Sequence, residues 1–223
     1  MFKKLFMLFK IGRKLTSSGA ISSIYEIYQP PLMIKILFFI IGFNFQDKQE
    51  IKSASPGKKL CNALQEMGTT FIKLGQFLAT RPDIIGENIS KDLERLQDKL
   101  PSFNSADAKN ILRKELGEEN FSEILNFSEP IAAASIAQVH FAKIKVKNET
   151  REIALKILRP NIEKIFNSEL DALMLLAFIV ETLVHKTKRL KLVEIVQLLR
   201  EITNVEMDLR FEAAAANEFF ENT

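Results

Sequence analysis

Two segments in the second half of the chain have strand-like sequences, QVHFAKIKV (Gln138 to Val146) and EIALKIL (Glu152 to Leu158). Apolar, β-branched and aromatic residues dominate both segments, and the polar turn KNET lies between them, which predicts a β-hairpin. The segments before and after this hairpin have helical rather than strand-like periodicity. Helices followed by a small sheet and then by more helices indicate an α+β fold.

Helical periodicity precedes the hairpin. Apolar residues at alternating four- and three-residue steps mark one face of a helix, at Leu60, Leu64, Met67, Phe71, Leu74 and Leu78. Arg81 and Pro82 end this predicted helix. A second helix is predicted from Ile89, Leu93, Leu96 and Leu100, and Pro101 ends it. Ser105 is placed to cap a third helix, which Gly117 terminates.

Helical periodicity returns after Pro160. The segment from Ala172 to Val184 is apolar on nearly every side, which predicts a buried helix. The last predicted element, from about Val193 to Glu221, is amphipathic and includes acids at Glu201, Glu206, Asp208 and Glu212.

The first 45 residues differ in character from the rest of the chain. Five cations and no acid occur in the first fourteen residues, at Lys3, Lys4, Lys10, Arg13 and Lys14. This pattern predicts a cationic amphipathic helix on an anionic membrane surface. The apolar stretch from Leu32 to Phe45 is shorter than the roughly 20 residues that span a bilayer, so an interfacial or buried helix is predicted there. The alternative is that both segments are core helices of a soluble protein.

These patterns divide the chain into four predicted parts. Residues 1–45 form the membrane-proximal helices, 46–58 a polar linker, 59–128 a helical extension, and 129–223 the lobe that contains the hairpin. The lone Cys61 excludes an internal disulfide and suits a reducing compartment. The net charge of +3 is too small to predict that the chain binds nucleic acid.

Small residues open the first strand of the hairpin, in the run from Pro130 to Gln138. Small side chains let backbone N–H groups approach a ligand, as a loop that covers phosphates requires. Lys156 lies on the second strand with apolar neighbours, and a strand lysine in this position holds the α- and β-phosphates of ATP in protein kinases. The alternative is a surface lysine whose stem covers apolar neighbours. Such a nucleotide lysine needs an orienting acid, for which the candidates are Glu206, Asp208 and Glu212.

A second polar set lies in and around the stretch FIKLGQFLATRPD (Phe71 to Asp83). Three- and four-residue steps place four polar residues on one helical face, distinct from the packing face: Thr69, Lys73, Gln76 and Thr80. Gly75 costs about 1 kcal/mol of helix propensity relative to Ala, which predicts the close approach of another backbone. Burying an unpaired ammonium costs several kcal/mol, so Lys73 requires acidic partners, for which Glu206 and Asp208 are candidates.

Three motifs in this order resemble the UbiB family of atypical kinase-like proteins. The KxGQ motif of that family is matched by Lys73, Gly75 and Gln76. Its alanine-rich loop is matched by Ala132, Ala133, Ala134 and Ser135, and its ExD motif by Glu206 and Asp208. The stretches LQDKLPSF, AAASIAQVH and LKILRPNI are also similar to that family. The resemblance implies a mostly helical α+β fold, with an atypical kinase-like N-lobe of a small antiparallel sheet and helices, and a helical KxGQ extension before it.

The resemblance also implies roles for these residues. Lys156 corresponds to the nucleotide lysine, and Glu212 to the helix glutamate that pairs with it. The loop from Ala132 to Ser135 would cover the phosphates of ATP, bound together with Mg. Lys73, Gly75 and Gln76 would form a regulatory element over the nucleotide site, directed at Glu206 and Asp208. In family terms this arrangement favours ATP binding and hydrolysis and obstructs access for a protein substrate.

Support of ubiquinone biosynthesis is the biological role that the resemblance implies. It would act at the cytoplasmic face of the inner membrane, as a peripheral protein that is not secreted. The implied partners are the membrane surface, prenyl-lipid quinone precursors and other proteins of ubiquinone biosynthesis, and no nucleic acid. Members often carry the label 2-polyprenylphenol 6-hydroxylase, but the chain has no G-x-G-x-x-G fingerprint and only two His, so redox catalysis is not predicted.

Two other functions remain open from the sequence. One is a non-catalytic membrane-surface module that binds a prenyl lipid or a biosynthetic partner. The other is true protein kinase activity. ATP-analogue binding separates the nucleotide-site interpretation from the membrane module.

Kinase-like folds also need a catalytic-loop Asp and Asn and a metal-binding Asp, which lie in the C-lobe after the helix glutamate. Only eleven residues follow Glu212, so we expect the C-lobe to be absent and no catalytic set to be complete. Asp83 and Asn88 have the catalytic-loop spacing, but they precede the nucleotide loop and lack the flanking His-Arg. A truncated or split member is predicted, and either a separate chain carries the C-lobe or this chain is vestigial. His140 and His185 have no Cys or acid at ligand spacing, so no metal site is predicted.

Overall fold

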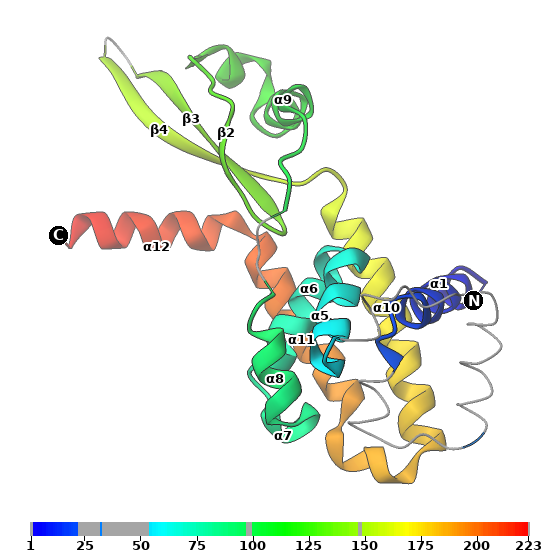
Figure 1. The fold of residues 1–223 in the computed structure, drawn as a ribbon. Helices are drawn as coiled ribbons and strands as arrows, with labels where there is room; N and C mark the ends of the chain where they lie inside the picture. The colour runs from blue at the N-terminus through cyan, green and yellow to red at the C-terminus, as the bar shows by residue number, and fades with distance from the viewer. Residues whose placement is uncertain (1, 22–31, 33–53, 97–99, 147–148, 223) are drawn as a thin grey trace. The chain divides into compact units, whose positions relative to one another are not determined.

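Two compact units make up the computed structural model of the chain, which describes residues 2–21, 32, 54–96, 100–146 and 149–222 (Figure 1). One unit comprises Met1–Gln97 and Lys164–Thr203, and the other comprises Asp98–Glu163 and Asn204–Thr223. Helices make up the described part of the first unit, and the second unit contains the sheet. The predicted mostly helical α+β fold is confirmed.

The helical unit has an apolar core that several helices share. Its elements are α1 (Phe2–Ser17), α5 (Pro56–Met67), α6 (Thr69–Ala79), α7 (Pro82–Ile85), α8 (Glu87–Leu93), α10 (Ile162–Leu183), the short 3-10 helix η1 (His185–Leu190) and most of α11 (Leu192–Met207). Helices α5, α6 and α8 pack together, and α1 packs on α5. The core side chains are at most 4% exposed and include Leu64, Phe71, Ile72, Leu93, Phe166 and Leu170.

Helices α5 and α6 replace the single helix predicted over residues 60–78. Gly68 separates them with φ 104° and ψ −168°, a backbone conformation that glycine adopts without steric cost. Its carbonyl accepts hydrogen bonds from the N–H groups of Phe71 and Ile72, which begins the second helix. Apolar residues of both helices face the same core, so the apolar spacing continues across the break and does not reveal it.

Helix α5 begins inside the segment predicted as a linker. The Ser55 hydroxyl accepts a hydrogen bond from the N–H of Lys58 at 3.3 Å, and Pro56 occupies the first turn. A serine cap followed by proline is a favoured helix start. Residues 46–53 of the predicted linker lie outside the described residues, as does the apolar segment predicted after Leu32.

Helix α1 has an inner and an outer apolar face. Ile11 is 5% exposed, whereas Leu5, Phe6 and Phe9 are 47%, 71% and 48% exposed. The helix therefore packs on its unit and still presents aromatic side chains outward. Within the described residues, no helix is long and apolar enough to cross a membrane.

The second unit is built around an antiparallel four-stranded sheet. Its elements are α9 (Ser105–Ser122), β1 (Ile124–Leu125), β2 (Pro130–Ala133), β3 (Ala137–Val146), β4 (Glu149–Leu158) and α12 (Leu209–Glu221). Strand β3 pairs with β4 along one edge and with β1 and β2 along the other. The predicted hairpin is confirmed as β3 and β4, whereas the two short strands β1 and β2 were not predicted.

Helix α9 packs against the sheet and forms the core of this unit. Ala108, Leu112 and Ile157 are buried together, and Leu155 packs against them. Successive strand residues point to opposite faces. Ile157 and Leu155 therefore face the core, and Lys156 between them points to the other face.

The ends of α9 differ in detail from the prediction. Asn104 rather than Ser105 caps the helix, because the Asn104 side chain accepts a hydrogen bond from the N–H of Ala106 at 2.8 Å. The Ser105 hydroxyl instead donates to Glu129 at 2.7 Å. Gly117 interrupts the helix with φ 80°, as its predicted role as a terminator requires.

Two of the later predicted helices also differ. Helix α10 exposes Phe178 (62%) and Leu183 (67%), so the segment from Ala172 to Val184 is not buried on every side. The predicted element from Val193 to Glu221 is two helices, α11 and α12. Asp208 separates them, and its carboxylate accepts a hydrogen bond from the N–H of Arg210 at 3.2 Å and caps α12.

Candidate functional site

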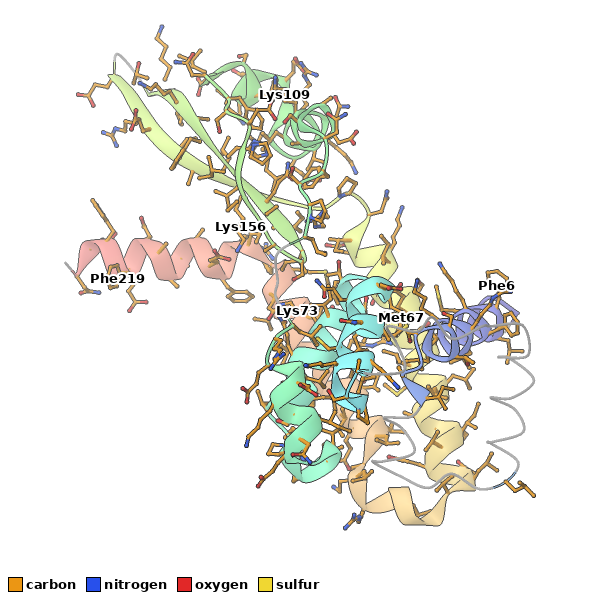
Figure 2. All side chains as sticks on the ribbon, in the orientation of Figure 1. Phe6, Met67, Lys73, Lys109, Lys156 and Phe219 are labelled. Carbon is orange, nitrogen blue, oxygen red and sulfur yellow. The ribbon has the colours of Figure 1, made fainter. Side chains whose placement is uncertain are left out.

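Lys156 projects from the face of the sheet opposite α9. Its Nζ lies 2.5 Å from Oε2 of Glu212 on α12. Figure 2 shows Lys156 beside this helix. The two side chains are 33% and 60% exposed. An ion pair this accessible contributes about 1 kcal/mol of stability or less. Its main consequence is therefore that the lysine ammonium is held in one direction.

The register of the sheet places the small-residue run beside Lys156. Ala132 on β2 pairs with Val139 on β3, and Val139 pairs with Lys156 on β4. Directly paired residues project from the same face, and neighbouring strands are about 4.8 Å apart. The methyl group of Ala132 and the stem of Lys156 therefore share one face, about 10 Å apart across the sheet.

The turn between β2 and β3 holds the other small residues. Ala133 pairs with Gln138, and the N–H of Ala134 donates to the carbonyl of Ala137 at 2.8 Å. Ala132 is exposed and Ala133 and Ala134 are half-buried, whereas Ser135 is fully buried. The accessible backbone of the run is therefore at its alanines.

The KxGQ residues lie on α6 in the helical unit. Gln76 donates a hydrogen bond through Nε2 to the carbonyl of Leu96, at 3.4 Å. A Cβ added to Gly75 would lie 2.2 Å from Cδ1 of Leu96 and 2.8 Å from Cδ1 of Leu64. The predicted close approach at Gly75 is present, but leucine side chains make it rather than another backbone. Lys73 is half-buried on the same helix.

The acids of the ExD motif belong to the sheet unit. Glu206 is half-buried near the end of α11, and Asp208 caps α12. The carboxylate of Asp208 accepts hydrogen bonds from Nε and Nη2 of Arg210, at 2.7 and 2.5 Å. The hydrogen bond from the Arg210 guanidinium lowers the pKa of Asp208 below its ordinary value. Pairing of Lys73 with these acids stays a prediction.

A buried polar network lies beside the turn and was missed by the sequence analysis. The Gln138 side chain accepts from the N–H of Phe103 at 2.8 Å and donates to its carbonyl at 3.3 Å. It also donates to Nε2 of His140 at 2.9 Å, so the Nδ1–H of His140 donates to the carbonyl of Ser128, at 2.8 Å. Both side chains are completely buried. The available signal was the pair of polar residues at 138 and 140, which alternate with the apolar residues Ala137, Val139 and Phe141.

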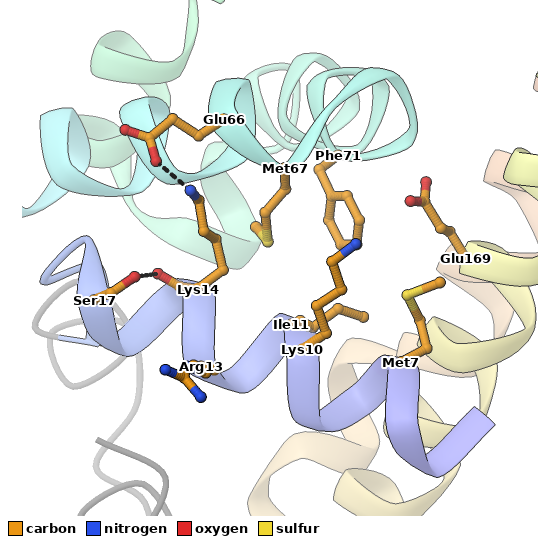
Figure 3. Close-up of a pocket in the computed structure, with 10 residues that line it drawn as sticks. All are labelled: Met7, Lys10, Ile11, Arg13, Lys14, Ser17, Glu66, Met67, Phe71 and Glu169. Atoms are coloured by element: carbon orange, nitrogen blue, oxygen red, sulfur yellow. Dashed lines mark hydrogen bonds and ion pairs between the residues drawn. The ribbon is translucent and has the colours of Figure 1, made fainter. Parts of the chain in front are cut away.

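A pocket of about 340 Å³ lies in the helical unit, where α1 meets α5, α6 and α10 (Figure 3). Met67 and Phe71 form part of its apolar lining, and Nζ of Lys14 pairs with Glu66 at 2.7 Å. Glu169 enters from α10, and burial raises the pKa of its carboxyl group. The pocket was not predicted from the sequence.

The residues of the sheet unit fit a nucleotide better than they fit a metal ion. The ammonium of Lys156 and the small side chain of Ala132 lie on one face of the sheet, so the phosphates of a nucleotide can approach the lysine there. In the part of the chain that the structure describes, no group of three or more His, Cys, Asp or Glu side chains could hold a metal ion. The chemistry that ATP supplies when bound is a transferable γ-phosphoryl group.

Comparison with protein families identifies the class of protein. Residues 95–223 match the ABC1 atypical kinase-like domain, and this match covers more than half of the chain. The chain belongs to this family of atypical kinase-like proteins. The sheet with its lysine–glutamate pair and the covering helix α9 is its kinase-like N-lobe.

Curated relatives place the chain beside the UbiB proteins, as its motifs predicted. It is 35% identical over 197 residues to a protein of Marinobacter nauticus named probable protein kinase UbiB, covering 86% of this chain and 35% of the relative. A protein of the same name from Vibrio atlanticus is 36% identical over 199 residues, covering 89% of this chain and 35% of the relative. The chain thus spans about a third of the length of these relatives.

Proposed function

We propose that the chain is an ATP-binding, kinase-like protein of the UbiB type that supports ubiquinone biosynthesis at a membrane surface. The observation that carries this proposal is the Lys156–Glu212 pair on the sheet face that also presents Ala132. In kinase-like folds such a pair orients the lysine toward the α- and β-phosphates of ATP. The names of the relatives support a kinase-like role.

Phosphoryl transfer needs more of the fold than the matched region. About two thirds of the length of the relatives lies outside the match, and we propose that this remaining part supplies the Mg ligands, in the same chain or in a separate one. Helix α12 supports this because it leaves Phe211, Phe219 and Phe220 between 62% and 79% exposed. Large exposed aromatic side chains of this kind favour a covering partner.

Calorimetric titration of the chain with ATP, with and without Mg, tests the proposal. We expect Lys156→Ala to weaken ATP binding by at least about tenfold, because a charge-assisted phosphate contact is lost. Lys143→Ala is the matched control, since Lys143 lies on the paired strand β3 and its Nζ pairs with Glu152 at 3.3 Å. Equal ATP affinities of the wild type and Lys156→Ala, or no saturable binding by either, would contradict the nucleotide site.

A non-catalytic membrane-surface module is the second candidate function, and α1 favours it. Leu5, Phe6 and Phe9 point outward from a helix segment that carries no acid. Such a helix binds anionic lipid surfaces by its apolar side chains and its cations. Peripheral attachment at the cytoplasmic face of the inner membrane, close to prenyl-lipid precursors, is compatible with both functions.

A further inference from the structure

Arg159 directly follows β4, three residues after Lys156, and its side chain holds the turn between β2 and β3. Nε and Nη2 both donate to the carbonyl oxygen of Ala134, at 3.0 and 2.7 Å. Nη2 also donates to the carbonyl oxygen of Pro101, at 2.9 Å. One guanidinium group therefore joins the end of the lysine strand to the small-residue turn and to the segment that precedes α9.

The main chain of Arg159 reinforces these contacts. Its N–H donates to the carbonyl of Ile136 at 2.8 Å, so the same residue binds the turn at two points. The guanidinium carbon lies 5.9 Å from the ring centroid of Phe103. Because Gln138 binds the main chain of Phe103 from the sheet, the turn, this segment and the end of β4 form one connected network.

The geometry of a peptide bond explains what this network controls. In a trans peptide the C=O of one residue and the N–H of the next point in opposite directions. Two hydrogen bonds to the Ala134 carbonyl therefore also fix the direction of the Ser135 N–H. Bonds donated by a guanidinium are stronger than neutral ones. The turn thus keeps one orientation relative to β4, where Lys156 lies.

Arginine suits this position better than any other cation. Its planar group supplies several N–H donors in a fixed fork, whereas lysine offers a compact charge on a flexible stem. Burial lowers the pKa of Arg159, yet arginine stays protonated in proteins. The fixed fork of the arginine therefore makes two hydrogen bonds to the Ala134 carbonyl and one to the Pro101 carbonyl at once.

We propose that Arg159 is a positioning residue for a nucleotide triphosphate, which holds the alanine turn and Lys156 in register so that both contact the same phosphate groups. The inference rests on the proposed nucleotide function, and it adds a residue that contacts the turn rather than the ligand. Removal of the Arg159 side chain should therefore weaken the contacts to the phosphates and leave the contacts to the nucleoside unchanged.

Binding of ATP and of adenosine by the variants Arg159→Met and Arg159→Lys tests this role. We expect Arg159→Met to weaken ATP binding by about tenfold while adenosine binding stays unchanged, because only the phosphates contact the turn. Arg159→Lys should lose less affinity for ATP than Arg159→Met does. Arg151→Met is the matched control, since Arg151 lies on β4, is 67% exposed and pairs with Glu149.

Amide hydrogen exchange gives a readout that does not need ATP. The amides from Ala133 to Ile136 should exchange faster in Arg159→Met than in Arg151→Met, while the β3–β4 hairpin keeps its protection. Unchanged exchange in the turn, or an equal loss of ATP and adenosine binding, overturns the inference. Absence of ATP binding in the wild type overturns the proposed function and the phosphate role together, whereas equal ATP binding by wild type and Arg159→Met overturns the inference alone.

Discussion

Glu169 is a half-buried acid in the helical unit. Its Oε2 is buried and has no hydrogen-bond partner among the described residues. Burial raises the pKa of this carboxyl group, and the nearby Thr70 hydroxyl and Lys10 ammonium, which act in the opposite direction, do not cancel the effect. An acid in this position costs stability whenever it is ionised.

The pH dependence of Glu169→Gln follows from that raised pKa. Between the ordinary pKa of a glutamate and the raised one, the folded chain binds more protons than the unfolded chain, so the free energy of unfolding falls as pH rises. We expect the variant to melt at a higher temperature than wild type at pH 8, and the difference to shrink as pH falls through the raised pKa to the ordinary one.

Thermal melts from pH 4 to pH 8 measure this effect. Glu194→Gln is the control, because Glu194 lies in the same unit and is exposed, with Lys191 as its partner. A difference between Glu169→Gln and wild type that does not change with pH would contradict the burial argument.

Helix α6 explains why a glycine occupies position 75 of the KxGQ motif. Leu64 and Leu96, 4% and 5% exposed, pack against the site where a Cβ would lie. Gly75→Ala gains about 1 kcal/mol of helix propensity but overpacks the core, which costs about 1–3 kcal/mol. We expect a net loss of roughly 1 kcal/mol in the free energy of unfolding.

A double-mutant cycle with Leu96→Ala checks this prediction by urea denaturation. The added methyl group should be tolerated once Leu96 is shortened. The double variant should therefore lose less free energy of unfolding than the two single variants lose in sum. Additive losses would show that the neighbouring leucines do not restrict position 75 to glycine.

The sequence predicted those elements whose pattern is local and strong. The β3–β4 hairpin was predicted because its apolar residues and polar turn are contiguous, whereas β1 and β2 are too short to show a pattern. The breaks at Gly68 and Asp208 were missed because apolar periodicity continues across each of them. Lys156 was predicted from its place on a strand after the small-residue run, whereas Glu212 was one of three candidate acids and was chosen only through the family resemblance. The contacts of Arg159 with Ala134 join residues distant in sequence, so no spacing rule could indicate them.

The charge of the whole chain is small, but its distribution is uneven. The net charge is +3, while the first fourteen residues alone carry five cations and no acid. Helix α1 also exposes Phe6 and Phe9, and its inner face is occupied by its own unit. A membrane would therefore be bound by the outer face, with α1 still packed on α5.

Flotation of the chain with vesicles of anionic and of neutral lipids tests this arrangement. We expect Phe6→Ser with Phe9→Ser to abolish most of the binding to anionic vesicles, since each buried aromatic contributes about 2 kcal/mol. Phe219→Ser with Phe220→Ser is the matched control, because these side chains are 71% and 79% exposed on α12. Binding should weaken as salt rises, since salt screens the attraction between the cations and the lipid. Equal flotation of wild type and the α1 variant would show that this helix is not the membrane anchor, and loss in the α12 variant alone would assign that role to α12.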